Sequence, residues 1–145
     1  MLVSGVVTTH QLEFYEDEHG DAPVARWLRE ELTLPKRQAI GYAMHLVLQR
    51  LGVAVCGTEF GKQLGGGLFE FRLRSDLRDR VRPGEKAGRF MFRVFCHPHG
   101  DRLILLLAGY DKGEDPSPRR QNAEITLARA RLRDWQRRRP PVPRR

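Results

Sequence analysis

Cysteine is scarce in this 145-residue sequence, which contains only Cys56 and Cys96. The two lie far apart, and neither belongs to a C-x-x-C pair. Disulfide frameworks and thiolate metal cages need more cysteines at closer spacing. We therefore expect a reducing, cytoplasmic setting, with no structural metal and no cofactor.

Long apolar runs are also missing. No segment reaches the roughly 20 apolar residues that a membrane-spanning helix requires, and residues 1–10 lack the basic and then apolar pattern of a secretory leader. We expect neither secretion nor membrane insertion. A chain of this length fits one domain, and we predict a single domain over residues 1–139 followed by a disordered Pro/Arg-rich tail over residues 140–145.

Acidic residues are few near the C-terminus. Residues 116–145 contain ten arginines against Glu124 and Asp134, whereas residues 1–115 contain sixteen basic and sixteen acidic side chains. The whole formal charge of +8 therefore comes from the C-terminal segment. This distribution favours a polyanionic partner such as nucleic acid. The alternative is a solvated tail that only adds solubility.

Two stretches, residues 67–74 and 89–96, alternate between bulky apolar side chains and arginines. Period-two alternation predicts strands with two different faces. One predicted face is apolar and carries Phe69, Phe71, Leu73, Phe90, Phe92 and Val94; the other carries Leu68, Glu70, Arg72, Arg74, Arg89, Met91, Arg93 and Phe95. A sheet face lined by arginines is suited to gripping phosphate groups.

The remaining pattern predicts an α+β fold with the element order β-α-α-β-β-β-α. Asp21 and Thr33 are predicted N-caps of two N-terminal helices that form a hairpin, and Ser117 is the predicted N-cap of a C-terminal helix. Strands are predicted over residues 8–15, 67–74, 89–96 and 102–110. We expect a four-stranded antiparallel sheet, in which one edge strand can also run parallel to its neighbour. The helices are expected to pack on the Phe-rich face and to leave the other face partly open.

Four segments in this order carry a family resemblance: Phe14–Glu18, Leu64–Arg72, Phe92–Val94, and Leu105–Lys112 leading to Pro118. Together they resemble the RelE/ParE superfamily of bacterial toxins, and within it the phage-derived HigB-like branch. The resemblance implies the toxin of a type II toxin-antitoxin system: a metal-independent, ribosome-dependent mRNA endonuclease. It also implies a cognate antitoxin that holds the toxin inactive, often one with a helix-turn-helix domain.

The resemblance assigns catalytic roles to Arg72, Arg93, Tyr110 and Lys112. Such cleavage requires the ribose 2′-hydroxyl to attack the adjacent phosphorus, and the planar guanidinium groups of Arg72 and Arg93 suit the dianionic phosphorane that forms. Tyr110 can stack on an RNA base or move a proton, and Lys112 is a candidate base.

Three further residues are predicted to bind RNA. Arg74 and Arg89 share the predicted arginine face, and His97 has the same strand parity as Arg93. His97 is also a reserve acid or base, although the His97-Pro-His99 segment is predicted to be an ordinary turn.

Structural explanations compete with these roles. Arg72 or Arg93 can simply pair with Glu70 across the sheet. Tyr110 can be an edge-of-core aromatic residue, and Lys112 a solvated turn residue.

Two rival functions stay open. Members of the same superfamily poison DNA gyrase by binding it, and fold alone does not separate the two activities. The second rival function is that of a degenerate toxin, which has lost its activity and serves as a nucleic-acid-binding or antitoxin-binding module. The segment Asp111–Asp115 supports it, because the family commonly has a basic pair there.

Overall fold

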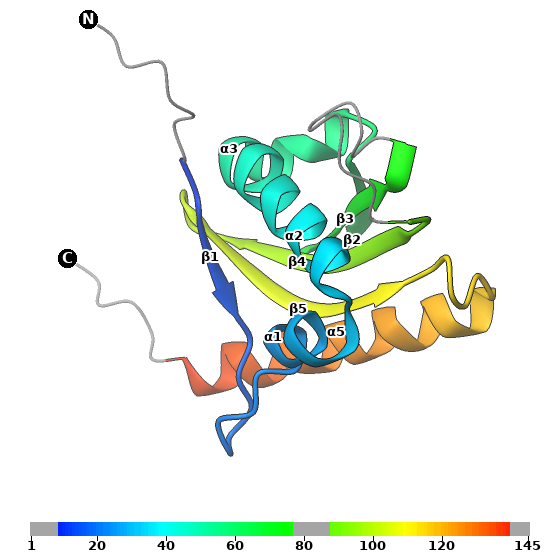
Figure 1. Ribbon diagram of the computed structural model, residues 1–145. Helices are drawn as coiled ribbons and strands as arrows, with labels where there is room; N and C mark the ends of the chain where they lie inside the picture. The colour runs from blue at the N-terminus through cyan, green and yellow to red at the C-terminus, as the bar shows by residue number, and fades with distance from the viewer. Residues whose placement is uncertain (1–8, 77–87, 140–145) are drawn as a thin grey trace, which may run out of the picture.

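The computed structural model describes residues 9–76 and 88–139 and contains one five-stranded mixed sheet (Figure 1). The strands are β1 (Gln11–Phe14), β2 (Gly61–Gly65), β3 (Leu68–Arg74), β4 (Met91–His99) and β5 (Leu103–Asp111), in the order β1-β5-β4-β3-β2. Strand β1 runs parallel to β5, and the other neighbours are antiparallel. The α+β class is confirmed, but the predicted four-stranded antiparallel sheet is wrong in its strand number.

Strand β2 is the element that the sequence pattern did not predict. Its five residues begin and end with glycine and show no apolar alternation, so the segment is typical of a connection. It forms a strand because Gly66 and Gly67, both with positive φ of 64° and 80°, make a tight turn that folds it back on β3. The glycine run thus bends the chain into β3.

The helices are α1 (Pro23–Arg26) with its π-helical continuation η1 (Trp27–Glu31), α2 (Leu34–Ala43), η2 (Met44–Leu48), α3 (Gln49–Leu51), the 3-10 helix η3 (Gly52–Gly57), and α5 (Pro118–Arg138). The predicted N-caps Thr33 and Ser117 are confirmed, since each side chain accepts a backbone N–H of its helix. Asp21 is not an N-cap. Ala22 holds that position, and the carboxylate of Asp17 organises the preceding turn by accepting from His19 N and Asp21 N.

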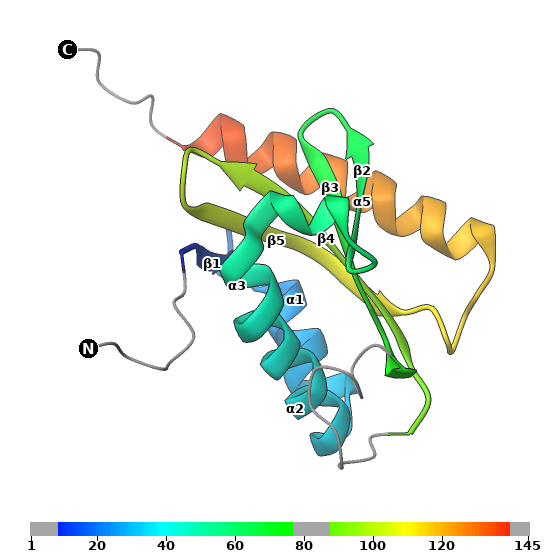
Figure 2. The same cartoon turned by 90° about the horizontal axis from the view of Figure 1, so that it is seen from above.

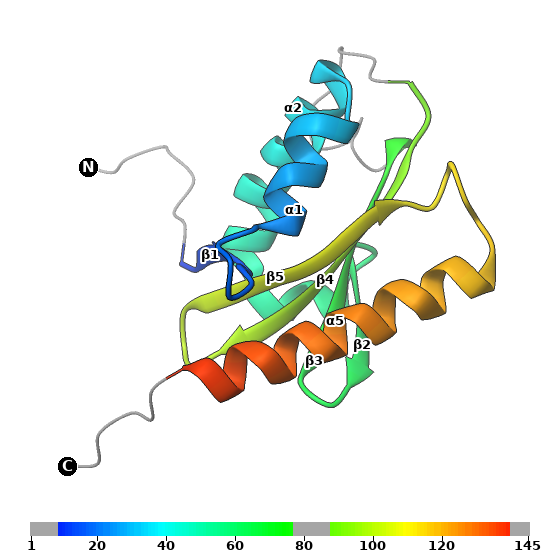
Figure 3. The same cartoon turned by 90° about the horizontal axis from the view of Figure 1, so that it is seen from below.

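The sheet is covered on both faces. The N-terminal helices lie over one face and α5 crosses the other, as the views from above and below show (Figures 2 and 3). Phe69, Phe71, Phe92 and Val94 belong to the core under the N-terminal helices. The predicted partly open face is therefore wrong: Ala128, Leu132 and Trp135 of α5 pack on it against Leu68, Phe95, Leu105 and Leu107. The C-terminal helix α5 was predicted correctly, but not the face of the sheet that it covers.

The segment Leu34–Gly57 is, by length and composition, apolar enough to cross a membrane, with a mean hydropathy of 1.4. In the structure its apolar side chains, including Ile40, Leu48 and Val55, are buried against the sheet. The segment also changes direction at Gly52, whose φ is +57°. This arrangement is that of a core helix.

Candidate active site

Three of the predicted catalytic side chains stand in one row across the sheet. Arg72 on β3 lies directly opposite Arg93 on β4, and Arg93 lies directly opposite Tyr110 on β5. Directly opposed residues of antiparallel strands project from the same face about 4.5–5.5 Å apart. The sheet register therefore brings Arg72, Arg93 and Tyr110 together.

A second row lies one step further along the same face. Arg74 is opposite Met91, and the backbone N–H of Lys112 donates to Met91 O at 2.7 Å. Lys112 is half-buried just beyond the end of β5, whereas Arg74 is exposed and pairs with Asp76 at 3.2 Å. Arg89 is exposed immediately before β4. Of these cations, Arg72 and Arg74 lie close enough to Arg93 for their charges to act on it.

Glu70 lies on the same face in the neighbouring row, opposite Phe95. It is fully buried, and its Oε2 accepts a hydrogen bond from Arg72 Nε at 2.5 Å. Its Oε1 lies 3.6 Å from Arg93 Nε. The competing interpretation, in which Arg72 and Arg93 pair with Glu70, describes the conformation seen here. The Glu70 carboxylate therefore bridges two opposed guanidinium groups. The formal charge of Glu70, Arg72 and Arg93 together is +1.

The two arginines differ in access. The side chain of Arg93 is only 7% exposed, whereas that of Arg72 is 31% exposed. Burial lowers the pKa of Arg93, and the charge of Glu70 opposes that shift; a guanidinium still stays protonated near neutral pH. Arg93 Nε is buried without a hydrogen-bond partner in the described structure. Its ion-pair partner, Glu70 Oε1, lies 3.6 Å away, just beyond hydrogen-bond distance.

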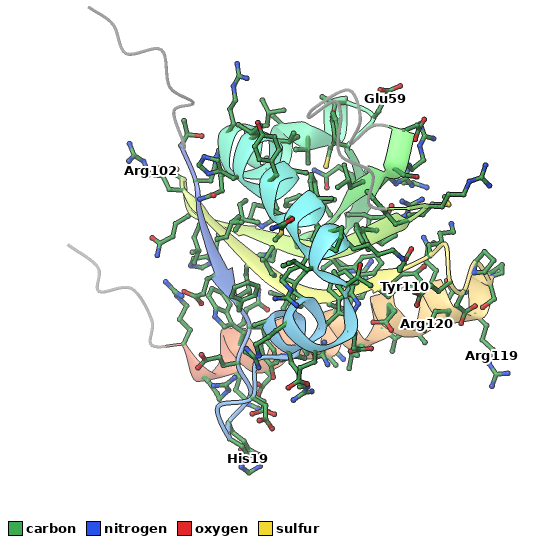
Figure 4. The ribbon with its side chains drawn as sticks, viewed as in Figure 1. His19, Glu59, Arg102, Tyr110, Arg119 and Arg120 are labelled. Carbon is green, nitrogen blue, oxygen red and sulfur yellow. The ribbon has the colours of Figure 1, made fainter. Side chains whose placement is uncertain are left out.

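Tyr110 does not offer a free ring for stacking. It is 1% exposed, its ring lies parallel to that of Phe95, and the guanidinium of Arg120 covers it 4.9 Å from the ring centroid. Figure 4 shows Tyr110 and Arg120 close together where β5 leads toward α5. Burial raises the pKa of Tyr110, so the phenol stays neutral and donates to Gln121 Oε1 at 3.3 Å. The stacking role is therefore not supported in this conformation.

His97 lies on the same face but away from this row. It is four residues beyond Arg93 on β4, which corresponds to about 13 Å along the strand. It is 9% exposed, and its Nδ1 lies 2.6 Å from Gly67 O, where it ties β4 to the β2–β3 turn. The predicted turn at His97–His99 is wrong, because these residues belong to β4. In residues 9–76 and 88–139, no group of three or more potential metal ligands occurs.

Asp111, the first residue of the acidic segment, is directed away from the arginine row. Asp111 pairs with Lys36 Nζ at 3.2 Å and accepts the N–H groups of Met91 and Gly113, each at 2.9 Å. Asp115 accepts from Ser117 at the start of α5, which lowers its pKa. Strand parity explains this separation, since Asp111 lies opposite Phe92 on the other face.

A pocket of about 180 Å³ opens beside Arg120, between α1, β5 and α5. Its lining includes Arg26, Trp27, Gly109, Glu124 and Arg131. Arg120, which covers the ring of Tyr110, is also one of the residues that line this pocket. There it donates a hydrogen bond to Glu124 at 2.8 Å.

Sequence reasoning did not identify Gln121 or Arg120 as members of the site. The apolar residues of α5 that face the sheet begin with Ile125. Gln121 stands four residues, or about one helical turn, before Ile125. That spacing could have placed it on the sheet-facing side. A scan against protein-family models and a search of curated proteins both returned no match to this chain.

Proposed function

We propose that this protein is the toxin of a type II toxin-antitoxin pair and acts as a metal-independent mRNA endonuclease on translating ribosomes. The observation that carries the proposal is the direct opposition of Arg72 and Arg93 in neighbouring strands. Like charges directly opposite each other are unfavourable in a sheet. The carboxylate of Glu70 contacts both arginines but can balance only one of their two charges, which leaves a site suited to an anionic ligand such as an RNA phosphate.

The proposed chemistry divides the work among three groups. Arg72 uses Nε to contact Glu70, and its terminal nitrogens have no hydrogen-bond partner among the described residues, so they can grip a non-bridging phosphate oxygen. Arg93 supplies a second positive charge beneath Arg72. Its surroundings are largely shielded from water, so it stabilises a negative charge more strongly. Lys112, in the neighbouring row, is proposed to move the proton of the attacking 2′-hydroxyl to the 5′-oxygen, which leaves as its bond to phosphorus breaks and a 2′,3′-cyclic phosphate forms. Arg74 and Arg89 hold the flanking phosphates.

The proposed partners follow from the family resemblance. The substrate is mRNA on the ribosome, in the cytoplasm. The cognate antitoxin, with a helix-turn-helix domain, is proposed to hold the toxin inactive.

A second candidate is a non-catalytic nucleic-acid-binding module. The observation that favours it is the bridging carboxylate of Glu70, which already occupies both arginines. A binding module would bind RNA without cleaving it.

Expression in a bacterial host tests these alternatives. We expect growth arrest within one generation and new RNA 5′ ends inside translated reading frames, mapped shortly after induction. Purified protein is expected to cleave ribosome-bound mRNA equally well with and without EDTA. Intact transcripts together with gyrase-linked DNA breaks would favour gyrase poisoning. RNA binding with neither cleavage nor arrest would favour the binding module.

A further inference from the structure

The Arg72–Arg93 pair is held by a carboxylate that does not itself reach the surface. Glu70 is two residues before Arg72 on the same face of β3 and is fully buried. Because both guanidinium groups contact its carboxylate, their repulsion is offset from beneath the face. The contact with Arg72 uses Nε, which fixes the plane of the guanidinium group.

Gln121 links this carboxylate to the C-terminal helix. Its Nε2 donates to Glu70 Oε1 at 3.4 Å, and its Oε1 accepts from the Tyr110 hydroxyl at 3.3 Å. Only one orientation of the amide satisfies both bonds, because the reverse would face a carbonyl toward a carboxylate. Gln121 lies in the first turn of α5, which Ser117 caps. The helix start, the carboxylate and the phenol are therefore joined in one network.

We propose that Gln121 and Glu70 are positioning residues of the cleavage site, which orient Arg72 for the RNA phosphate by fixing its Nε side. This inference rests on the proposed endonuclease function and adds to it: α5 becomes part of the active-site scaffold rather than only a cover for the sheet. Gln121 acts through Glu70 and Arg72, without contact with the RNA.

Gln121→Met is the sharpest test, because it keeps the side-chain length and removes both hydrogen bonds. We expect kcat for cleavage of ribosome-bound mRNA to fall about tenfold, a size usual for coupled contacts, with KM within twofold of wild type. In an Arg72→Ala background the same change is expected to have no further effect on kcat. Gln136→Met, at an exposed position on the same helix, is the matched control and should change nothing.

A readout independent of cleavage is exchange of the Arg72 Nε proton, followed by NMR. Gln121→Met should speed this exchange about tenfold at unchanged melting temperature, and Gln136→Met should not. If wild-type protein cleaves no RNA, the proposed function fails, and the exchange measurement still decides whether Gln121 holds Arg72. The inference is overturned if Gln121→Met lowers only the melting temperature, or lowers kcat equally with and without Arg72. Glu70→Gln, which retains size, is expected to give the same pattern as Gln121→Met.

Discussion

Arg93→Ala is expected to abolish growth arrest and to lower the rate of mRNA cleavage by about 100-fold or more, the usual cost of removing a preorganised donor from a charged transition state. Arg93 is the middle member of the row, opposite both Arg72 and Tyr110. Its side chain is 7% exposed, so the charge that it supplies is poorly screened by water. The measurement is single-turnover cleavage of ribosome-bound mRNA, with growth after induction as the cellular readout.

Two control variants make this result interpretable. Arg102→Ala removes an exposed arginine between β4 and β5, far from Tyr110 in Figure 4, and should retain full activity. Arg93→Lys keeps the charge but loses the planar fork, so intermediate activity is expected. Circular dichroism must show that each variant is folded. A folded Arg93→Ala protein that cleaves RNA at the wild-type rate would contradict the proposed role of the row.

The faces of β3 and β4 could be predicted from the sequence because strand alternation is a local property. Phe69 and Phe71 went correctly to one face, and Arg72 and Arg93 to the other. The N-caps Thr33 and Ser117 were predictable for the same reason, since a cap depends on residues within one turn.

The features that failed depend on contacts distant in the sequence. Strand β2 forms by pairing with β3 although its own five residues carry no strand signal. The side chosen by α5 depends on Leu68 and Phe95, which lie more than twenty residues before it. His97 has the parity of Arg93, but its distance along β4 separates them. Parity identifies a shared face and does not identify a shared site.

The pairing of Glu70 with the arginines was considered from the sequence, but the pairing of Asp111 with Lys36 was hidden. Three of the five residues in the segment Asp111–Asp115 are acidic. Their negative charge is unfavourable for binding RNA phosphates. In the folded chain, Lys36 takes Asp111 on the opposite face, while Glu70, on the arginine face, becomes the bridging anion. A count of charges in Asp111–Asp115 therefore could not show that Asp111 lies on the other face of the sheet.

The second large effect is expected where α1 and η1 meet the sheet. Trp27 is 7% exposed, and its ring meets that of Phe92 edge-on with centroids 5.8 Å apart. Trp27→Ala is expected to lower the free energy of unfolding by about 3–5 kcal/mol, because it empties a large buried site. Equilibrium urea denaturation measures this value, and an effect below 1 kcal/mol, well under that range, would show that the indole is not an essential part of the core.

Gly109 offers a coupled test of the same contact. A Cβ atom added there would lie 2.7 Å from Trp27 Cζ3, closer than side chains tolerate. Gly109→Ala should therefore cost about 1–3 kcal/mol through overpacking, and this cost should vanish in the Trp27→Ala background, because the clashing ring is gone. Gly41→Ala is the matched control: its added Cβ meets nothing within 4 Å in the middle of α2, and it should stabilise by roughly 0.5–1 kcal/mol. Equal effects of the two glycine substitutions would contradict the close approach of Trp27 to β5. The opposite signs follow from one physical difference, the presence of an aromatic ring above one glycine and of solvent above the other.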